Sequence, residues 1–345
     1  MNRAWPAIFP IALLPPLIFH WLPLWRRNGI WFGVTVAPGY TDGPEARTVL
    51  HRFRIAIWLL ALAAISVTVL GPPAIFPWAL PAAMTLEIVG ALAAFVHARR
   101  QTLPHALHPS PVRSVSLMAP PEGLPGGAAA ALVPFAILGA GALYLYLNWS
   151  RIPERFPVHW GIDGSPDGWN GRTWQGVYTP LLLGAVHCGL MLLIALGVLR
   201  ASPRGRVAAN AAASAQLRRV MLQFLVAAVW GMALLLAVVS LAPLLPEHPL
   251  GNLPPILISF GLLALAIPFV WRLIRIGRTI GSGGDGTPDQ CWKLGIFYFN
   301  PADAAIFVEK RFGIGYTCNF ANRTTWLFLG LLFLFSLVPV LLRYL

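Results

Sequence analysis

Residues 178–199 read YTPLLLGAVHCGLMLLIALGVL and contain no Asp, Glu, Lys or Arg. A helix that crosses a bilayer needs about 20 mostly apolar residues, so this stretch predicts a membrane-spanning helix. The same composition extends over the whole chain of 345 residues, of which 57% are hydrophobic and 11% are charged. Soluble domains average about 25% charged residues. The composition therefore excludes a soluble domain and indicates an all-α polytopic membrane protein.

Eight segments have the length and composition of spanning helices. They are residues 4–24, 55–71, 77–96, 128–147, 178–199, 220–243, 252–274 and 324–342. We therefore expect five regions along the chain. They are residues 1–127 with three spans, 128–200 with two spans around an outer loop at 148–177, 201–284 with two spans, a cytoplasmic module at 285–323, and the last span at 324–345.

The Lys and Arg residues are distributed unevenly around these segments. If the N-terminus lies outside, the inner segments carry 20 of the 25 basic residues and the outer segments carry five. Because inner loops of membrane proteins carry an excess of Lys and Arg, we expect both termini on the outside. This topology accounts for the net charge of +13, so the charge does not indicate a nucleic-acid partner.

The predicted outer loop has IPERFPVHWGIDGSPDGW at residues 152–169. Proline favours extended backbone before it, and Asp-Gly steps mark turns, so we expect a small ordered cap. His159, Asp163 and Asp167 have the chemistry of cation ligands or acid–base groups. Pro166 interrupts the pattern of a calcium loop, and we predict no metal site and no cofactor. Two interpretations stay open: a structural cap, and a surface that recognises a ligand or peptide.

The predicted cytoplasmic module has WKLGIFYFNPAD at residues 292–303 and IFVEKRFGIGYTCNF at 306–320. Its β-branched and aromatic runs, separated by an Asn-Pro step, predict a small strand-rich fold. Residues 28–38 read NGIWFGVTVAP and predict a strand near this module. The module is either a structural hairpin docked on the membrane or a docking surface for a cytoplasmic protein.

The loop resembles the signature of a domain of unknown function found in the SdpI family of bacterial membrane proteins. Pro157, His159, Gly164, Asp167 and Trp169 carry this resemblance. The best understood member type is an immunity protein against a sporulation-delaying toxin. This protein also holds a repressor at the membrane.

The predicted cytoplasmic module is similar to a short domain of longer family members. Residues 28–38 resemble an inner-loop element of the family in which Thr35 replaces the family's Arg. The matching module residues are Trp292, Lys293, Tyr298, Asn300, Pro301, Asp303, Lys310, Arg311, Gly313, Gly315 and Asn319.

The resemblance implies a receptor or immunity-type protein of the bacterial inner membrane. It would sense a peptide or amphiphile outside and relay this signal to a cytoplasmic partner. The expected ligand-binding residues are Pro157, His159, Asp163, Asp167 and Trp169. The expected partner-docking residues are Trp292, Tyr298, Asn300, Asp303, Lys310, Arg311 and Asn319.

Two ionisable residues lie inside predicted spans, Glu87 and His187. A carboxylate in the bilayer is costly and marks a functional site or an interhelical hydrogen bond. The pair favours a transporter or an accessory subunit of a membrane complex as the alternative function. Motifs of catalytic nucleophiles, zinc proteases and phosphate loops do not occur, so we predict that the chain is not an enzyme. The enzyme class that stays open is a metal-dependent membrane enzyme that uses His159, Asp163 and Asp167 as metal ligands or acid–base groups.

Overall fold

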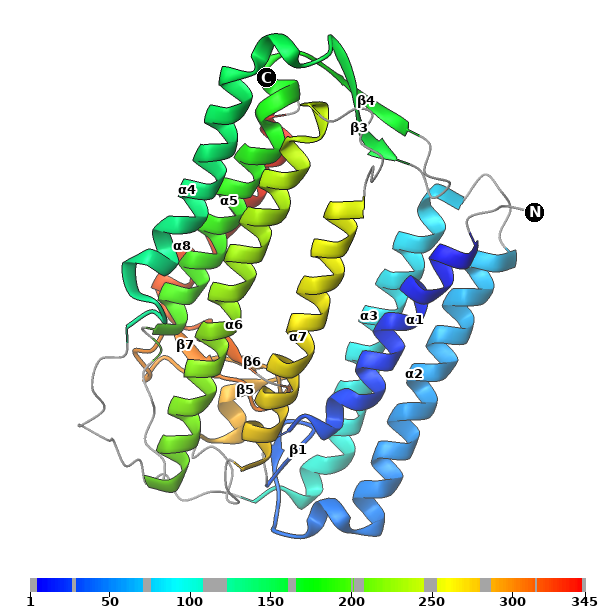
Figure 1. Cartoon of the computed structure of the whole chain (residues 1–345). Helices are drawn as coiled ribbons and strands as arrows, with labels where there is room; N and C mark the ends of the chain where they lie inside the picture. The colour runs from blue at the N-terminus through cyan, green and yellow to red at the C-terminus, as the bar shows by residue number, and fades with distance from the viewer. Residues whose placement is uncertain are drawn as a thin grey trace. The chain divides into compact units, whose positions relative to one another are not determined.

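The computed structural model describes residues 5–26, 29–70, 76–107, 123–160, 166–199, 201, 208–244, 253–279, 287–313 and 315–342. These described residues form eight α-helices and four pairs of antiparallel strands (Figure 1). The helices are α1 (Trp5–Trp21), α2 (Pro44–Leu70), α3 (Phe76–Thr102), α4 (Gly127–Leu147), α5 (Trp174–Leu199), α6 (Ala208–Ser240), α7 (Leu253–Thr279) and α8 (Arg323–Leu342). The strands are β1 (Ile30–Trp31), β2 (Val34–Thr35), β3 (Arg155–Trp160), β4 (Pro166–Gly171), β5 (Trp292–Lys293), β6 (Phe297–Tyr298), β7 (Phe307–Glu309) and β8 (Tyr316–Cys318).

Each predicted span coincides in position with one of these helices. Within the described residues, five helical segments are long and apolar enough to cross a membrane. They are Pro44–Val67, Pro81–His105, Gly127–Leu147, Trp174–Leu199 and Ser214–Leu244, and two shorter apolar segments are Leu13–Leu24 and Arg323–Leu337. These helices indicate a multi-pass membrane protein, whereas the count of eight spans and the orientation of the termini stay predictions.

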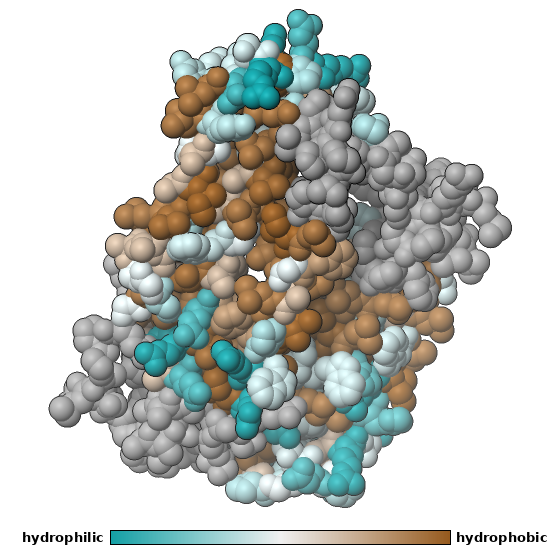
Figure 2. Space-filling model, in the orientation of Figure 1, coloured by the Kyte–Doolittle hydropathy of each residue, from teal (hydrophilic) through white to brown (hydrophobic). Residues whose placement is uncertain are grey.

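The surface of the helices supports contact with lipid. Apolar side chains gather along the helices, and hydrophilic side chains gather near the helix ends (Figure 2). Large apolar residues such as Leu132, Leu263 and Phe333 are more than 60% exposed. Extended apolar patches of this kind are unfavourable in water but suit the hydrocarbon of a bilayer.

The chain divides into two compact units, each of which combines distant parts of the sequence. The first unit contains Met1–Leu117, Pro203–Ala215 and Ile274–Ala321. It therefore combines α1, α2 and α3 with the strands β5 to β8. The second unit contains Met118–Ser202, Gln216–Leu273 and Asn322–Leu345. It holds α4, α5, α8, the hairpin β3–β4 and most of α6 and α7.

The core of the first unit is built around the hairpin β1–β2. Ile30, Phe32 and Val34 are at most 1% exposed, because the hairpin packs against α2 and α3. The ring of Phe32 lies 5.2 Å from that of Phe53 on α2 and 5.6 Å from that of Phe95 on α3. The strand expected within residues 28–38 is therefore present as a buried two-stranded hairpin.

The second unit combines packed helices with the hairpin β3–β4. The hairpin pairs Arg155 with Gly171 and Pro157 with Trp169, and its register shifts beyond Pro157. Helix α5 begins at Trp174, soon after β4 ends, and packs against α4 and α8. The hairpin therefore leads directly into a helix of the unit's core.

Candidate functional site

Two tight turns of the first unit meet at their glycines. Phe32 and Gly33 connect β1 to β2 with φ values of 43° and 73°, and Leu294 and Gly295 follow β5 with φ values of 53° and 82°. Consecutive positive φ values are rare in L-residues and favour glycine. A Cβ added to Gly33 would lie 2.5 Å from the carbonyl oxygen of Gly295. The two turns are therefore in direct backbone contact.

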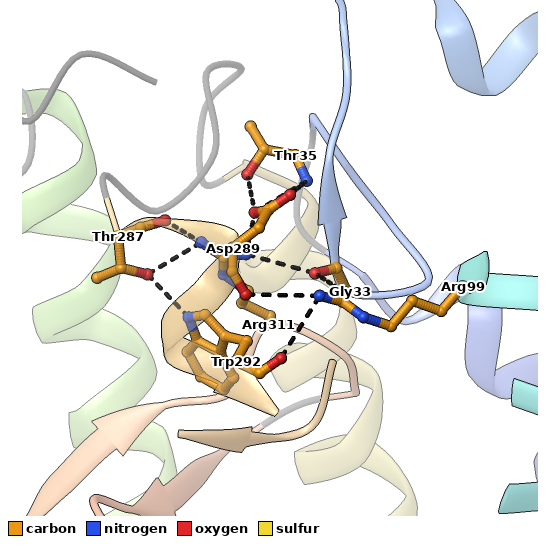
Figure 3. Close-up of polar contacts among 7 residues, drawn as sticks. All are labelled: Gly33, Thr35, Arg99, Thr287, Asp289, Trp292 and Arg311. Atoms are coloured by element: carbon orange, nitrogen blue, oxygen red, sulfur yellow. Dashed lines mark hydrogen bonds and ion pairs between the residues drawn. The ribbon is translucent and has the colours of Figure 1, made fainter. Parts of the chain in front are cut away.

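Arg99, in the last turn of α3, holds both turns with its guanidinium group. Its Nη1 donates to the carbonyl oxygen of Gly33 at 2.6 Å, and its Nη2 donates to that of Trp292 at 3.4 Å (Figure 3). Arg99 is only 8% exposed. Hydrogen bonds from a charged donor are stronger than those from a neutral one, so Arg99 ties the helix to both hairpins.

A second arginine, Arg311, lies between β7 and β8 and is fully buried. Its Nη1 donates to the Oδ1 of Asp289 at 2.5 Å and to the carbonyl oxygen of Gly33 at 3.3 Å. Asp289 also accepts from the Oγ1 of Thr35 at 2.9 Å and from the Thr35 backbone nitrogen. We call Thr35, Arg99, Asp289 and Arg311 the polar clamp (Figure 3).

Thr287 and Trp292 lie next to the polar clamp and contact Arg311. Arg311 donates to both oxygens of Thr287, and the Nε1 of Trp292 donates to the Oγ1 of Thr287 at 2.8 Å. The guanidinium carbon of Arg311 lies 5.2 Å from the centre of the Trp292 ring, within cation–π range. The clamp joins the N-terminal hairpin to the C-terminal strands through buried, charge-assisted contacts.

Most of the predicted partner-docking residues are buried. Lys310 is exposed, whereas the other six have exposed fractions between 0 and 7%: Trp292, Tyr298, Asn300, Asp303, Arg311 and Asn319. The hydroxyl of Tyr298 donates to Asp303 at 2.7 Å, and the Nδ2 of Asn319 donates to the carbonyl oxygens of Asn300 and Asp303 at 2.9 and 2.7 Å. These six buried residues stabilise the fold of the module, and their role in docking a partner stays a prediction.

The predicted ligand-binding residues belong to the second unit. Pro157 and Trp169 are cross-strand neighbours in the hairpin, and Trp169 is 46% exposed. The guanidinium carbon of Arg155 lies 4.9 Å from the centre of the Trp169 ring. His159 and Asp167 occupy β3 and β4, but their side chains, like the whole of Asp163, lie outside the described residues.

Sequence reasoning missed an apolar groove between α4 and α5, with a volume of about 420 Å³. It is lined by Phe135, Leu138, Gly139, Ala142, Trp174, Tyr178, Leu181, Leu182 and Ala185. Trp174 and Tyr178 also form a stack with Trp149, with ring centroids 4.9 to 6.1 Å apart. The small residues Gly139 and Ala142, three positions apart on α4, are the one sequence signal for such a hollow.

The two intramembrane residues belong to different units. Glu87 on α3 is 3% exposed, and within the described part of the chain its carboxylate oxygens have no hydrogen-bond partner. His187 is half-buried on α5 in the second unit.

Comparisons with known proteins match two short segments of the chain. Residues 136–184 match a domain of unknown function (DUF1648), and residues 301–326 match a family of unknown function (DUF5808). No curated protein and no solved structure matches the chain. The first segment contains the hairpin β3–β4 and most of the residues that line the groove, on both α4 and α5. The second contains β7, β8 and the start of α8. The chain is thus a membrane protein that contains domains of unknown function.

Proposed function

We propose that this chain is a receptor or immunity-type membrane protein of the SdpI kind, which binds an amphiphile beside the hairpin β3–β4. The observation that carries the proposal is the apolar groove that ends at the aromatic stack of Trp149, Trp174 and Tyr178. A relay to a cytoplasmic partner completes the proposed function.

The chemistry of the groove suits a ligand with an apolar tail. Leu138 and Leu181 offer only hydrocarbon, whereas Trp174 and Tyr178 combine apolar rings with polar edges. Such aromatic residues favour the level of the lipid headgroups. A tail in the groove would therefore place its polar head at the level of the hairpin, where Arg155 and Trp169 are exposed.

The connection to the inner strands runs along the chain. Helix α5 supplies one wall of the groove and packs against α8. Helix α8 follows β8 after only four residues, and β8 pairs with β7 in register from Phe307 to Glu309. A ligand that shifts α5 against α8 would pull on the short segment between α8 and β8. In the proposed relay, this shift displaces β7 and β8, the strands on either side of Arg311.

Binding of dansyl-labelled undecanoic acid to the purified full chain tests the proposal. Energy transfer from tryptophan to the dansyl group reports the dissociation constant. Ala142→Phe places a phenyl ring in the groove, where it would overlap with the ligand tail. We expect this overlap to cost at least about 1.4 kcal/mol of binding free energy, which weakens binding by about tenfold or more. Ala227→Phe is the matched control, since Ala227 lines a separate apolar groove between α6 and α7. Equal affinity of both variants would contradict the proposal.

The alternative function is a transporter or an accessory subunit, and the buried Glu87 favours it. Its carboxylate has no hydrogen-bond partner within the described residues, and such groups often mark ion pathways. Proton flux into proteoliposomes that contain the wild type, but not the Glu87→Gln variant, would support this alternative. Equal flux in both would remove its main argument.

A further inference from the structure

The hairpin β5–β6 has two chemically different faces. Trp292 and Tyr298 are paired across the strands and are at most 2% exposed. Lys293 and Phe297 are the next cross-strand pair and point to the other face, where Lys293 is exposed and Phe297 is 40% exposed. Leu294, in the turn between them, is 48% exposed. We call Lys293, Leu294 and Phe297 the hairpin face.

Leu294 occupies a position that ordinary turn chemistry does not explain. Its φ of 53° is in the left-handed region, which Asn and Gly adopt more easily than a branched apolar residue. Retained backbone strain of this kind points to a role for the side chain. An exposed leucine in a strained turn is suited to contact with an apolar surface outside the unit.

The turn is held near the C-terminal end of α3. The apolar run of α3 ends at Val96, and Arg99 lies about 4.5 Å further along the helix axis at 1.5 Å per residue. Arg99 donates to the carbonyl oxygen of Trp292, and a Cβ added to Gly295 would lie 3.0 Å from the Cδ of Arg99. This contact fixes the hairpin to the last turn of α3, just beyond the apolar run of that helix.

The segment after β8 contacts the same face. The ring of Phe297 lies 5.6 Å from that of Phe320, and Phe320 precedes the first residue of α8 by three positions. The hairpin face thus lies beside the end of α3 and the segment of the first unit that contains Phe320. Its one charge is the cation Lys293, which complements the anionic headgroups that basic residues near a membrane attract.

We propose that the hairpin face is a lipid-binding site. Leu294 and Phe297 insert between lipid chains at the interface, and Lys293 binds an anionic phospholipid headgroup. This site does not depend on the amphiphile proposed for the second unit. It removes the hairpin face from the surface that a cytoplasmic protein could contact, whereas exposed residues elsewhere on the module, such as Lys310, stay available to the proposed partner.

A fluorescent probe on the full chain tests this site. Cys188, Cys291 and Cys318 are replaced by Ala, and a single cysteine at Leu294→Cys carries the dye NBD. Ala302→Cys is the matched control, since Ala302 is exposed on the same module but outside the hairpin face. Each protein is placed in vesicles of phosphatidylcholine with brominated chains, with or without phosphatidylglycerol. Elution in detergent at the position of the wild type verifies the fold of each variant.

We expect the brominated chains to quench the probe at position 294 by about twofold and to leave position 302 almost unchanged, because only an interfacial probe reaches the chains. Phosphatidylglycerol should increase the quenching at position 294, and Lys293→Glu should abolish this increase.

Three outcomes would contradict the proposal. Quenching of the probe at position 294 by aqueous iodide instead of brominated chains would overturn it. Quenching that is independent of phosphatidylglycerol would overturn the assignment to anionic lipid. Protection from iodide only after addition of a cytosolic protein fraction would assign the face to a protein partner and would also overturn it.

Discussion

The backbone of Gly33 touches the backbone of Gly295, although the two residues lie near opposite ends of the chain. Both have positive φ values, and Arg99 donates to the carbonyl oxygen of Gly33 while its side chain packs against Gly295. The contact leaves no space for a Cβ at Gly33, and a Cβ at Gly295 would lie 3.0 Å from the Arg99 side chain and 3.1 Å from the carbonyl oxygen of Phe32. The first unit therefore depends on two glycines for a geometric reason as well as a conformational one.

Replacing Gly33 by Ala should destabilise the first unit strongly. Gly39→Ala is the control, because Gly39 also has a positive φ, of 84°, but a Cβ there would have no neighbour within 4 Å. We expect the control to cost about 1 kcal/mol from φ strain alone, and Gly33→Ala to cost roughly 1 to 3 kcal/mol more from the backbone clash. Thermal unfolding of the purified chain measures the difference. Equal effects of the two variants would mean that the turns do not touch.

Removing one charge of the polar clamp should cost more than removing the pair. Arg311→Met leaves the half-buried Asp289 carboxylate without its ion-pair partner, and we expect a loss of up to about 3 kcal/mol, at the lower end of the cost for a fully buried pair. The double variant Asp289→Asn with Arg311→Met should recover part of this loss, because Asn still accepts from Thr35 and carries no charge. Unfolding free energies of the two single variants and the double variant form the cycle. Additive losses would show that the two groups are not coupled.

Leu294→Asn should stabilise the hairpin β5–β6 and weaken its contact with lipid. Asn adopts the left-handed region more easily than Leu, so we expect a gain of up to about 1 kcal/mol in detergent. Leu294→Ala keeps the strain and loses the apolar side chain, so it separates the two effects. If Leu294→Asn is no more stable than Leu294→Ala, the strain at this turn is negligible.

Burial raises the pKa of the Cys318 thiol above its ordinary value of 9.0. The folded state therefore retains the thiol proton over a pH range in which the unfolded state releases it, and this contribution to stability is lost as the pH rises through 9 and above. Alkylation by iodoacetamide requires the thiolate, so modification of Cys318 should rise with pH later than that of an exposed cysteine at Ala302→Cys. Mass spectrometry of the modified peptides gives both profiles. Coincident profiles would show that Cys318 is open to water.

The helices could be predicted from the sequence, but the pairing of the strands could not. Apolar composition over about 20 residues predicts a span without any knowledge of its neighbours, which is why each predicted span coincides with a helix. The strand runs at 296–299 and 306–308 are close to β6 and β7, but β6 pairs with β5 instead of β7. The turn at Leu294 and Gly295 permits this pairing, and leucine is not a residue that signals such a turn.

The candidate sites could be predicted only in part, for a related reason. The similarity that singled out Trp292, Tyr298 and Arg311 carries no information on the direction of their side chains. The alternation of Trp292 with Lys293 indicates that these two residues lie on opposite faces, but the buried face can be identified only from the folded unit. The groove between α4 and α5 depends on how two helices pack, and the polar clamp joins residues from opposite ends of the chain.

The composition of the first unit also determines when it can form during synthesis. Arg99 and the apolar hairpin β1–β2 emerge early from the ribosome, but their partners Asp289, Gly295 and Arg311 emerge near the end. At a synthesis rate of about 5–20 residues per second, about 10 to 50 seconds pass between the synthesis of the hairpin β1–β2 and the synthesis of the strands that cover it. During this interval the first unit is incomplete, with exposed aromatic side chains and one unclamped turn at Phe32 and Gly33. A chain that stops before β5 would keep that surface permanently, which would mark incomplete copies for chaperones and proteases.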